Sequence, residues 1–118
     1  MKVRITVGGA PITASLIDNA TSRDFASLLP LTLTLTDYAA TEKIGDLPRR
    51  LTTDGSPAGV DPAVGDITYY APWGNLALFH RDAGYAAGLI KLGTIDSGIE
   101  ALSMAGPLAA TIELIEEE

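Results

Sequence analysis

The residues best suited to chemistry lie around position 80. His80 is the only histidine of the chain, and Asp82 follows at a spacing that puts both side chains on one face of a strand. A histidine held by a carboxylate can act as a general base. A hydrolytic triad would also need a nucleophile such as Ser97, and nothing in the sequence brings Ser97 close. The candidate catalytic residues are His80 and the neighbouring Arg81. A lone histidine, however, is more often a surface or interface residue.

Aromatic residues gather in the same region. Tyr69, Tyr70, Trp73 and Phe79 fall within one predicted hairpin. Strand alternation puts Tyr69 and Tyr70 on opposite faces, so one should enter the core and the other should face outward. Trp73 lies at the turn between the strands, where full burial is not expected.

Two interpretations of these rings stay open. They could line a cleft that binds a ligand, with an arginine, Arg81 or Arg49, as polar anchor. They could instead seal the edge of the core, where amphipathic aromatic residues often lie. For the first interpretation, the candidate ligand-binding residues are Tyr38, Tyr70, Trp73, Arg81 and Tyr85.

Other kinds of site are not indicated. One histidine and no cysteine argue against a transition-metal site, the carboxylates do not form a calcium loop, and no glycine-rich phosphate loop precedes a helix. We therefore expect no metal and no cofactor.

The net charge of −7 would repel a phosphate backbone, so nucleic acid is not an expected partner. Glu113 and the run 116–118 supply part of this charge, in a terminus interpreted as solvated.

The composition is typical of one folded domain spanning residues 1–118, with 47% apolar and 19% charged residues. The N-terminus runs directly into the alternating segment 2–7 and has no apolar signal-peptide core. No apolar run approaches the roughly 20 residues that span a bilayer. We therefore expect a cytoplasmic protein without a membrane segment.

Alternation predicts most of the strands. Leu31, Leu33 and Leu35 alternate strictly with threonines. The remaining predicted strands are 2–7, 12–16, 43–47, 50–53, 64–71, 76–81, 89–95 and 108–115. Eight or nine short strands with frequent Gly and Pro turns predict a mostly β sandwich or barrel.

Two short helices complete the predicted elements. Residues 23–29 show helical spacing, with Thr21 as a cap and Pro30 ending the helix. Ser97 and Glu100 have the spacing of a capping box, which predicts a second helix that ends at Gly106.

The order of features along the whole chain resembles the cyclophilin-like family of small bacterial and archaeal proteins of unknown function. The resemblance implies a closed eight-stranded β-barrel capped by two short helices, and it implies no established activity. It is carried by Asp18-Asn19, Leu28-Leu29-Pro30-Leu31, Tyr38, Glu42-Lys43-Ile44, Leu47-Pro48-Arg49, Gly59, Gly65-Asp66-Ile67, the run from Tyr70 to Ala77, Leu92-Gly93 and the run from Ile95 to Leu102.

Phe79-His80-Arg81 also matches the Phe-His-Arg segment of true cyclophilins, whose arginine is catalytic in prolyl isomerisation. The rest of the cyclophilin pattern is missing, including the Gln-Phe-Phe motif that builds the pocket floor. Prolyl isomerase activity is therefore a hypothesis that rests on a match of three residues.

Three functions follow from these observations. The leading hypothesis is a non-enzymatic module that binds a small molecule or an extended peptide near Tyr70, Trp73 and Arg81. The first alternative is an enzyme, either a residual prolyl isomerase or a hydrolase that uses His80. The second is a homo-oligomeric structural component with Tyr70 and Trp73 at its interface.

Overall fold

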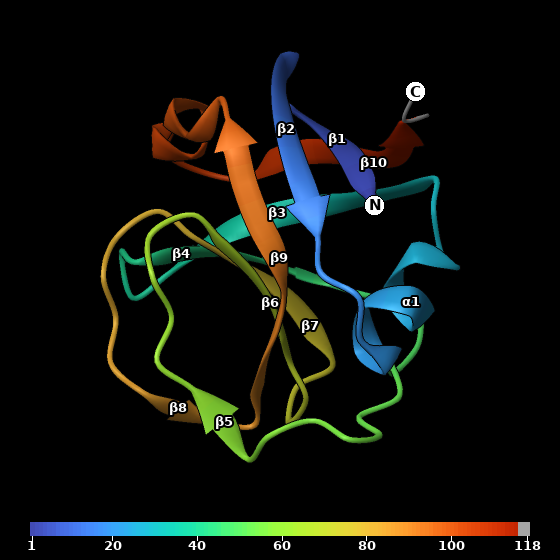
Figure 1. Cartoon of the computed structure of the whole chain (residues 1–118). Coiled ribbons are helices and arrows are strands. Elements are labelled where there is room, and N and C mark those ends of the chain that lie inside the picture. Colours follow the sequence, from blue (N-terminus) through green and yellow to red (C-terminus); the bar gives the residue numbers. More distant parts are fainter. Residues whose placement is uncertain (116–118) are drawn as a thin grey trace.

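The computed structural model describes residues 1–115 and shows a closed antiparallel barrel of eight strands (Figure 1). The order around the barrel is β1-β10-β3-β4-β7-β6-β9-β2, so each strand pairs with two neighbours. The predicted mostly β class and eight-stranded barrel are confirmed. The barrel strands are β1 (Lys2–Val7), β2 (Ala10–Leu16), β3 (Leu31–Tyr38), β4 (Glu42–Asp46), β6 (Asp66–Tyr70), β7 (Asn75–Phe79), β9 (Leu89–Ser97) and β10 (Leu108–Ile115), and a separate two-stranded sheet joins β5 (Gly59–Val60) to β8 (Ala86–Ala87).

The first hairpin shows how the sequence builds the barrel wall. Val3, Ile5 and Val7 of β1 are buried, while the residues between them face outward. Gly8 and Gly9 form the turn with φ of 54° and 85°, a left-handed conformation that glycine adopts without strain. The alternation that predicted a half-buried strand therefore reflects one face turned into the barrel.

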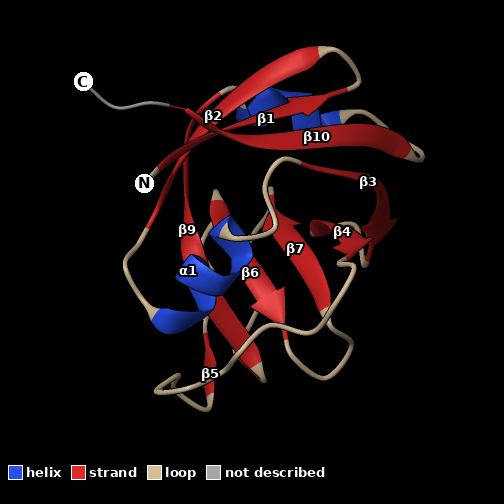
Figure 2. Cartoon of the chain, turned by 90° about the vertical axis from the view of Figure 1, so that its right-hand side faces the viewer, coloured by secondary structure: helices blue, strands red, loops and turns tan. Residues whose placement is uncertain are grey.

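Helix α1 (Ala20–Ala26) lies over one opening of the barrel, where the strands surround it in Figure 2. It begins three residues earlier than predicted, because Asn19 rather than Thr21 is its cap: Asn19 Oδ1 accepts a hydrogen bond from the Ser22 N–H at 2.7 Å. Thr21 is buried, and its hydroxyl donates to the Thr52 carbonyl. Phe25 packs from α1 into the core and closes this end.

The expectation of two helices is wrong: residues 1–115 contain one α-helix and one 3₁₀ turn, η1 (Ile99–Ser103). Ser97 does not cap a helix, because it is the last residue of β9 and pairs with Thr13 of β2, with 2.5 Å between the two hydroxyl oxygens. Gly98 follows with φ of 89° and redirects the chain. Leu102 is buried in the core, so η1 still contributes to the barrel interior.

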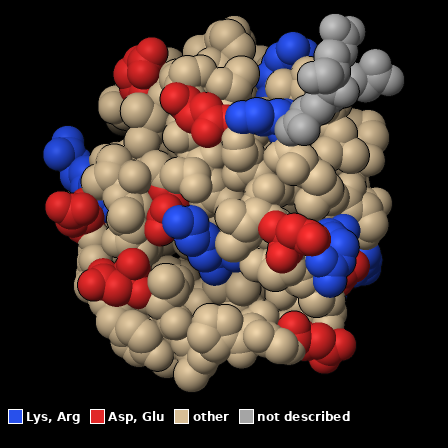
Figure 3. Space-filling view, in the orientation of Figure 1, with Lys and Arg blue, Asp and Glu red and all other residues tan. Residues whose placement is uncertain are grey.

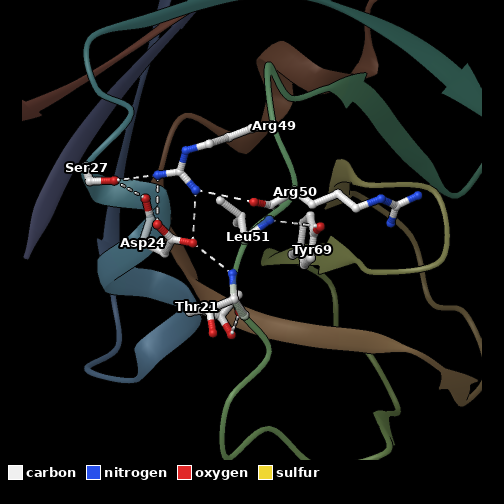
Figure 4. Close-up of polar contacts among 8 residues, drawn as sticks. Thr21, Asp24, Ser27, Arg49, Arg50, Leu51 and Tyr69 are labelled. Atoms are coloured by element: carbon white, nitrogen blue, oxygen red, sulfur yellow. Dashed lines mark hydrogen bonds and ion pairs between the residues drawn. The ribbon is translucent and has the colours of Figure 1, made fainter.

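The predicted strand at 50–53 is also wrong. Its backbone donors bond to side chains instead of to a neighbouring strand: the Leu51 N–H donates to the Tyr69 hydroxyl at 3.1 Å, and the Thr52 N–H donates to Asp24 at 2.7 Å (Figure 4). Arg49 binds the same Asp24 carboxylate through two nitrogens at 2.8 and 3.1 Å, and this lowers the pKa of Asp24. These contacts fasten the irregular segment 47–57 to α1.

Strand β7 is buried on both faces, unlike a strand with one side in water. Leu76 and Leu78 belong to the core inside the barrel, whereas Ala77 and Phe79 belong to a second, smaller cluster outside the wall. The segment 80–88, including β8, covers that outer face. The outer cluster holds the candidate site.

Charged side chains are dispersed on the face shown in Figure 3, where acidic and basic groups are interspersed. Glu113 pairs with Arg4, whereas residues 116–118 of the acidic terminus lie outside the described residues. Among residues 1–115, no helix has the length and apolar content needed to cross a membrane.

Candidate functional site

A cavity of about 270 Å³ lies in the outer cluster, on the outside of the barrel wall formed by β4 and β7. Its apolar surface comes from outward-facing residues of adjacent strands and from the covering segment. These are Ile44, Ala77, Phe79, Ala83, Ala86 and Leu89. The closed barrel has no free edge here, so a ligand would contact side chains rather than extend the sheet.

Three aromatic rings form one side of the cavity. Trp73 lies between Tyr38 and Tyr70, with ring centroids 5.4 and 5.2 Å apart and interplanar angles of 83° and 85°. Such edge-to-face pairs are favourable beyond the area they bury. Trp73 is 52% exposed and Tyr38 is 43% exposed, so the ring cluster is also open to solvent. We call Tyr38, Tyr70 and Trp73 the aromatic cluster.

The turn that carries Trp73 is held from two sides. The Trp73 and Gly74 N–H groups both donate to the Tyr70 carbonyl, and Gly74 has φ of 69°. Arg50 donates to the carbonyl of Ala71 at 2.6 Å and reaches that of Pro72 at 3.5 Å. The turn that carries Trp73 is therefore in contact with a side chain from the irregular segment 47–57.

Besides the tyrosines, the polar residues of the lining are Thr41, Glu42 and Asn75, and the last two lie near opposite ends of its β4–β7 floor. Glu42 is half-buried, and burial raises the pKa of its carboxyl above the ordinary value. Asn75 is only 3% exposed, and its Oδ1 is buried without a hydrogen-bond partner among the described residues. Buried polar atoms are nearly always bonded. This oxygen has almost no accessible surface, so it lies behind the cavity lining and does not open into the cavity.

The structure brings together three of the five predicted ligand-binding residues. Tyr38, Tyr70 and Trp73 line the cavity, but Arg81 and Tyr85 lie outside its lining. Tyr85 is 62% exposed and packs over Gly59, where an added Cβ would stand 2.6 Å from its hydroxyl. The backbone of Arg81 donates to the Thr41 carbonyl, and its side chain is exposed.

His80 lies apart from the cavity, at the barrel end beside Lys43 and Asp37. Its Nε2 is buried without a hydrogen-bond partner among the described residues, and burial, with Lys43 and Arg81 nearby, lowers its pKa. No hydrogen bond joins His80 to Asp82 in the part of the chain that is described. Ser97, the suggested nucleophile, bonds to Thr13 instead. Residues 1–115 contain no cluster of three or more His, Asp or Glu side chains placed to hold a metal ion.

Sequence reasoning missed Glu42 and Asn75. Glu42 and Ile44 alternate on the outer face of β4, but the segment is too short for its pattern to stand out. Asn75 begins a strand buried on both faces, which shows no polar–apolar alternation.

Comparison with known proteins agrees with this architecture. The chain is similar to the solution structure of a hypothetical protein from Archaeoglobus fulgidus, with a TM-score of 0.70 and 21% sequence identity over 96% of this chain and 93% of that one. This likeness shows a shared fold. No curated protein matches the sequence significantly. The model of the cyclophilin-like family matches residues 5–113, nearly the whole described barrel, and the chain therefore belongs to the cyclophilin-like family.

Proposed function

We propose that this domain is a non-enzymatic binding module whose ligand, a small molecule, occupies the cavity beside Trp73. The observation that carries the proposal is the concave, mostly apolar cavity walled by the aromatic cluster, with the half-buried carboxylate of Glu42 in its lining. Ligand sites are concave, mostly apolar and supplied with a few polar groups, and the volume of about 270 Å³ suits a small metabolite.

The prolyl isomerase alternative is less well supported. Catalysis would need a cation close to the prolyl nitrogen, beside an apolar pocket for the ring. Phe79 lines the cavity, but neither Arg nor Lys is among the described residues of the cavity lining, and Arg81 stands outside it. We therefore favour binding without turnover over isomerisation.

The interface alternative rests on the exposure of Trp73 and Tyr38. An oligomer that used these rings would bury them against a second copy and close the cavity. A solution mass measured for wild type and for Trp73→Ala separates this alternative from ligand binding.

A thermal-shift screen against metabolites and proline-containing peptides tests the proposal. A ligand that binds only the folded state raises the melting temperature. We expect at least one small molecule to stabilise the wild type and the control Tyr85→Ala, which removes an exposed ring outside the cavity. The same compound should not stabilise Trp73→Ala. Equal stabilisation of Trp73→Ala would contradict the proposed site, and a dimer that Trp73→Ala converts to monomer would favour the interface alternative.

A further inference from the structure

The charge of the cavity lining favours a cationic ligand over an anionic one. Glu42 is the only charged residue among the residues of 1–115 that line the cavity. No Lys, Arg or His forms an ion pair with it in residues 1–115, and its neighbour Lys43 points into the barrel, where it binds Asp37. A half-buried carboxylate without a counter-ion repels anions and gains from a cation placed beside it.

The hydrogen-bonding groups of Glu42 also favour a ligand with a cationic head. An ionised Glu42 has hydrogen-bond acceptors only, so it can pair with a ligand that carries donors. Glu42 pairs with Phe79 and Asn75 pairs with Asp46 across β4 and β7, so Glu42 and Asn75 stand near opposite ends of the cavity floor. At about 3.4 Å per residue, the separation along the strands is roughly 13 Å. The end of the cavity at Glu42 thus offers acceptors to a ligand that carries donors.

The aromatic cluster adds a third feature. Tyr38 lies opposite Glu42 on the neighbouring strand, and Tyr70 lies opposite Asn75, while Trp73 contacts both tyrosines. The faces of Trp and Tyr rings attract ammonium groups, most strongly where water is excluded. A carboxylate next to such rings is the combination that recognises an organic cation.

Building on the binding function proposed above, we infer that the cavity is selective for an organic ammonium ion, whose charged head lies against Glu42 and the rings of Tyr38 and Trp73. The apolar part of the ligand would lie against Ile44, Ala77 and Phe79 in the cavity lining. The anionic character of the whole chain, with a net charge of −7, favours the approach of such a ligand.

Three probes of matched size and different charge test the inference: benzylammonium, benzyl alcohol and benzoate. Binding is measured at pH 7.5 by calorimetry, with amide chemical-shift changes to locate each probe. We expect benzylammonium to bind wild type at least tenfold more tightly than benzyl alcohol, and benzoate to bind more weakly than both. Glu42→Gln should remove the preference for benzylammonium over benzyl alcohol. Glu100→Gln, which changes an exposed carboxylate outside the cavity, should retain it.

The inference and the proposed function can fail separately. Equal binding of benzylammonium and benzyl alcohol at the cavity, or a preference that survives Glu42→Gln, would overturn the cation selectivity and leave the cavity as a binding site. Benzylammonium that binds Trp73→Ala as tightly as wild type, with shifts away from the aromatic cluster, would contradict both. If no probe binds at millimolar concentration, the inferred selectivity is wrong, and the metabolite screen then decides the binding function alone.

Discussion

Arg49 and Arg50 are neighbours in the sequence, yet their guanidinium groups extend to opposite sides of the segment 47–57 (Figure 4). Arg49 binds Asp24 of α1, and Arg50 binds the carbonyls of Ala71 and Pro72. The pair therefore connects the helix that closes the barrel to the turn that carries Trp73. One side of the candidate site depends on a segment without regular secondary structure.

Removing the Arg50 contact should loosen this turn with little loss of fold stability. Arg50→Ala deletes two exposed hydrogen bonds, so we expect a loss of at most roughly 1 kcal/mol in unfolding free energy. Trp73 is the only tryptophan, so its fluorescence reports the turn directly. Its anisotropy should fall in Arg50→Ala and stay unchanged in the control Arg23→Ala, whose ion pair with Asp18 lies elsewhere. Unchanged anisotropy in Arg50→Ala would show that Arg50 does not position Trp73.

The same segment depends on a buried hydroxyl. The Tyr69 ring fills the core, and its hydroxyl accepts the Leu51 N–H. Tyr69→Phe keeps the ring but leaves that buried N–H without a partner, which should cost about 1–3 kcal/mol. Tyr85→Phe, which changes an exposed tyrosine, should stay within about 0.5 kcal/mol of wild type. Urea unfolding of both variants measures the difference, and equal midpoints would mean that the Leu51–Tyr69 bond contributes nothing.

How far the sequence predicts this fold differs from element to element. Strict alternation in 31–36 and in 2–7 locates two strands, because each has one face in the barrel and one outside. Closure into a barrel, as opposed to a sandwich, followed from the family resemblance, since strand count alone does not distinguish the two. The capping-box pattern at Ser97 failed because strand pairing with Thr13 placed that residue in β9.

The candidate site was predictable only in part. Clustering in the sequence drew attention to Tyr70 and Trp73, and the structure places both at the cavity. Glu42 and Asn75 come together with the rings only through the pairing of β4 with β7, a relationship that no local pattern encodes. Long-range strand register therefore decides which polar groups share the cavity.

The ion pair between the buried Lys43 and the exposed Asp37 should lose different amounts of stability depending on which partner is replaced. Lys43 is 0% exposed, and its Nζ lies 2.7 Å from Asp37 Oδ1 and donates to the Met104 carbonyl at 2.5 Å. The Lys43 contact also lowers the pKa of Asp37. Asp37→Asn leaves a buried ammonium without a counter-ion, whereas Lys43→Met replaces the lysine with an apolar chain of similar length and leaves Asp37 able to reach water. We expect Asp37→Asn to be the more destabilising.

The double variant tests whether the unpaired ammonium of Lys43 causes the loss of stability in Asp37→Asn. Lys43→Met combined with Asp37→Asn removes both charges and should be more stable than Asp37→Asn alone. Chemical unfolding of the wild type, the two single variants and the double variant completes the cycle. A double variant less stable than either single variant, or a Lys43→Met that costs more than Asp37→Asn, would contradict the role of Asp37 as counter-ion.

His80 should make the fold sensitive to mild acid. Burial, Lys43 and Arg81 lower its pKa below the ordinary 6.5, and Asp37 opposes this only in part. The unfolded chain therefore binds a proton more readily than the folded one, so stability is full above pH 6.5 and falls as the pH drops below that value. The raised pKa of Glu42 acts with the opposite sign, because there the folded state takes up the proton more readily.

A loss of stability on acidification toward pH 5.5 is thus assigned to the only histidine. We expect the melting temperature of the wild type to fall over this range and that of His80→Phe, which keeps a ring and removes the proton site, to stay level or rise slightly. Glu42→Gln serves as the control and should fall at least as much as the wild type. An equal fall in His80→Phe would show that other groups carry the pH dependence.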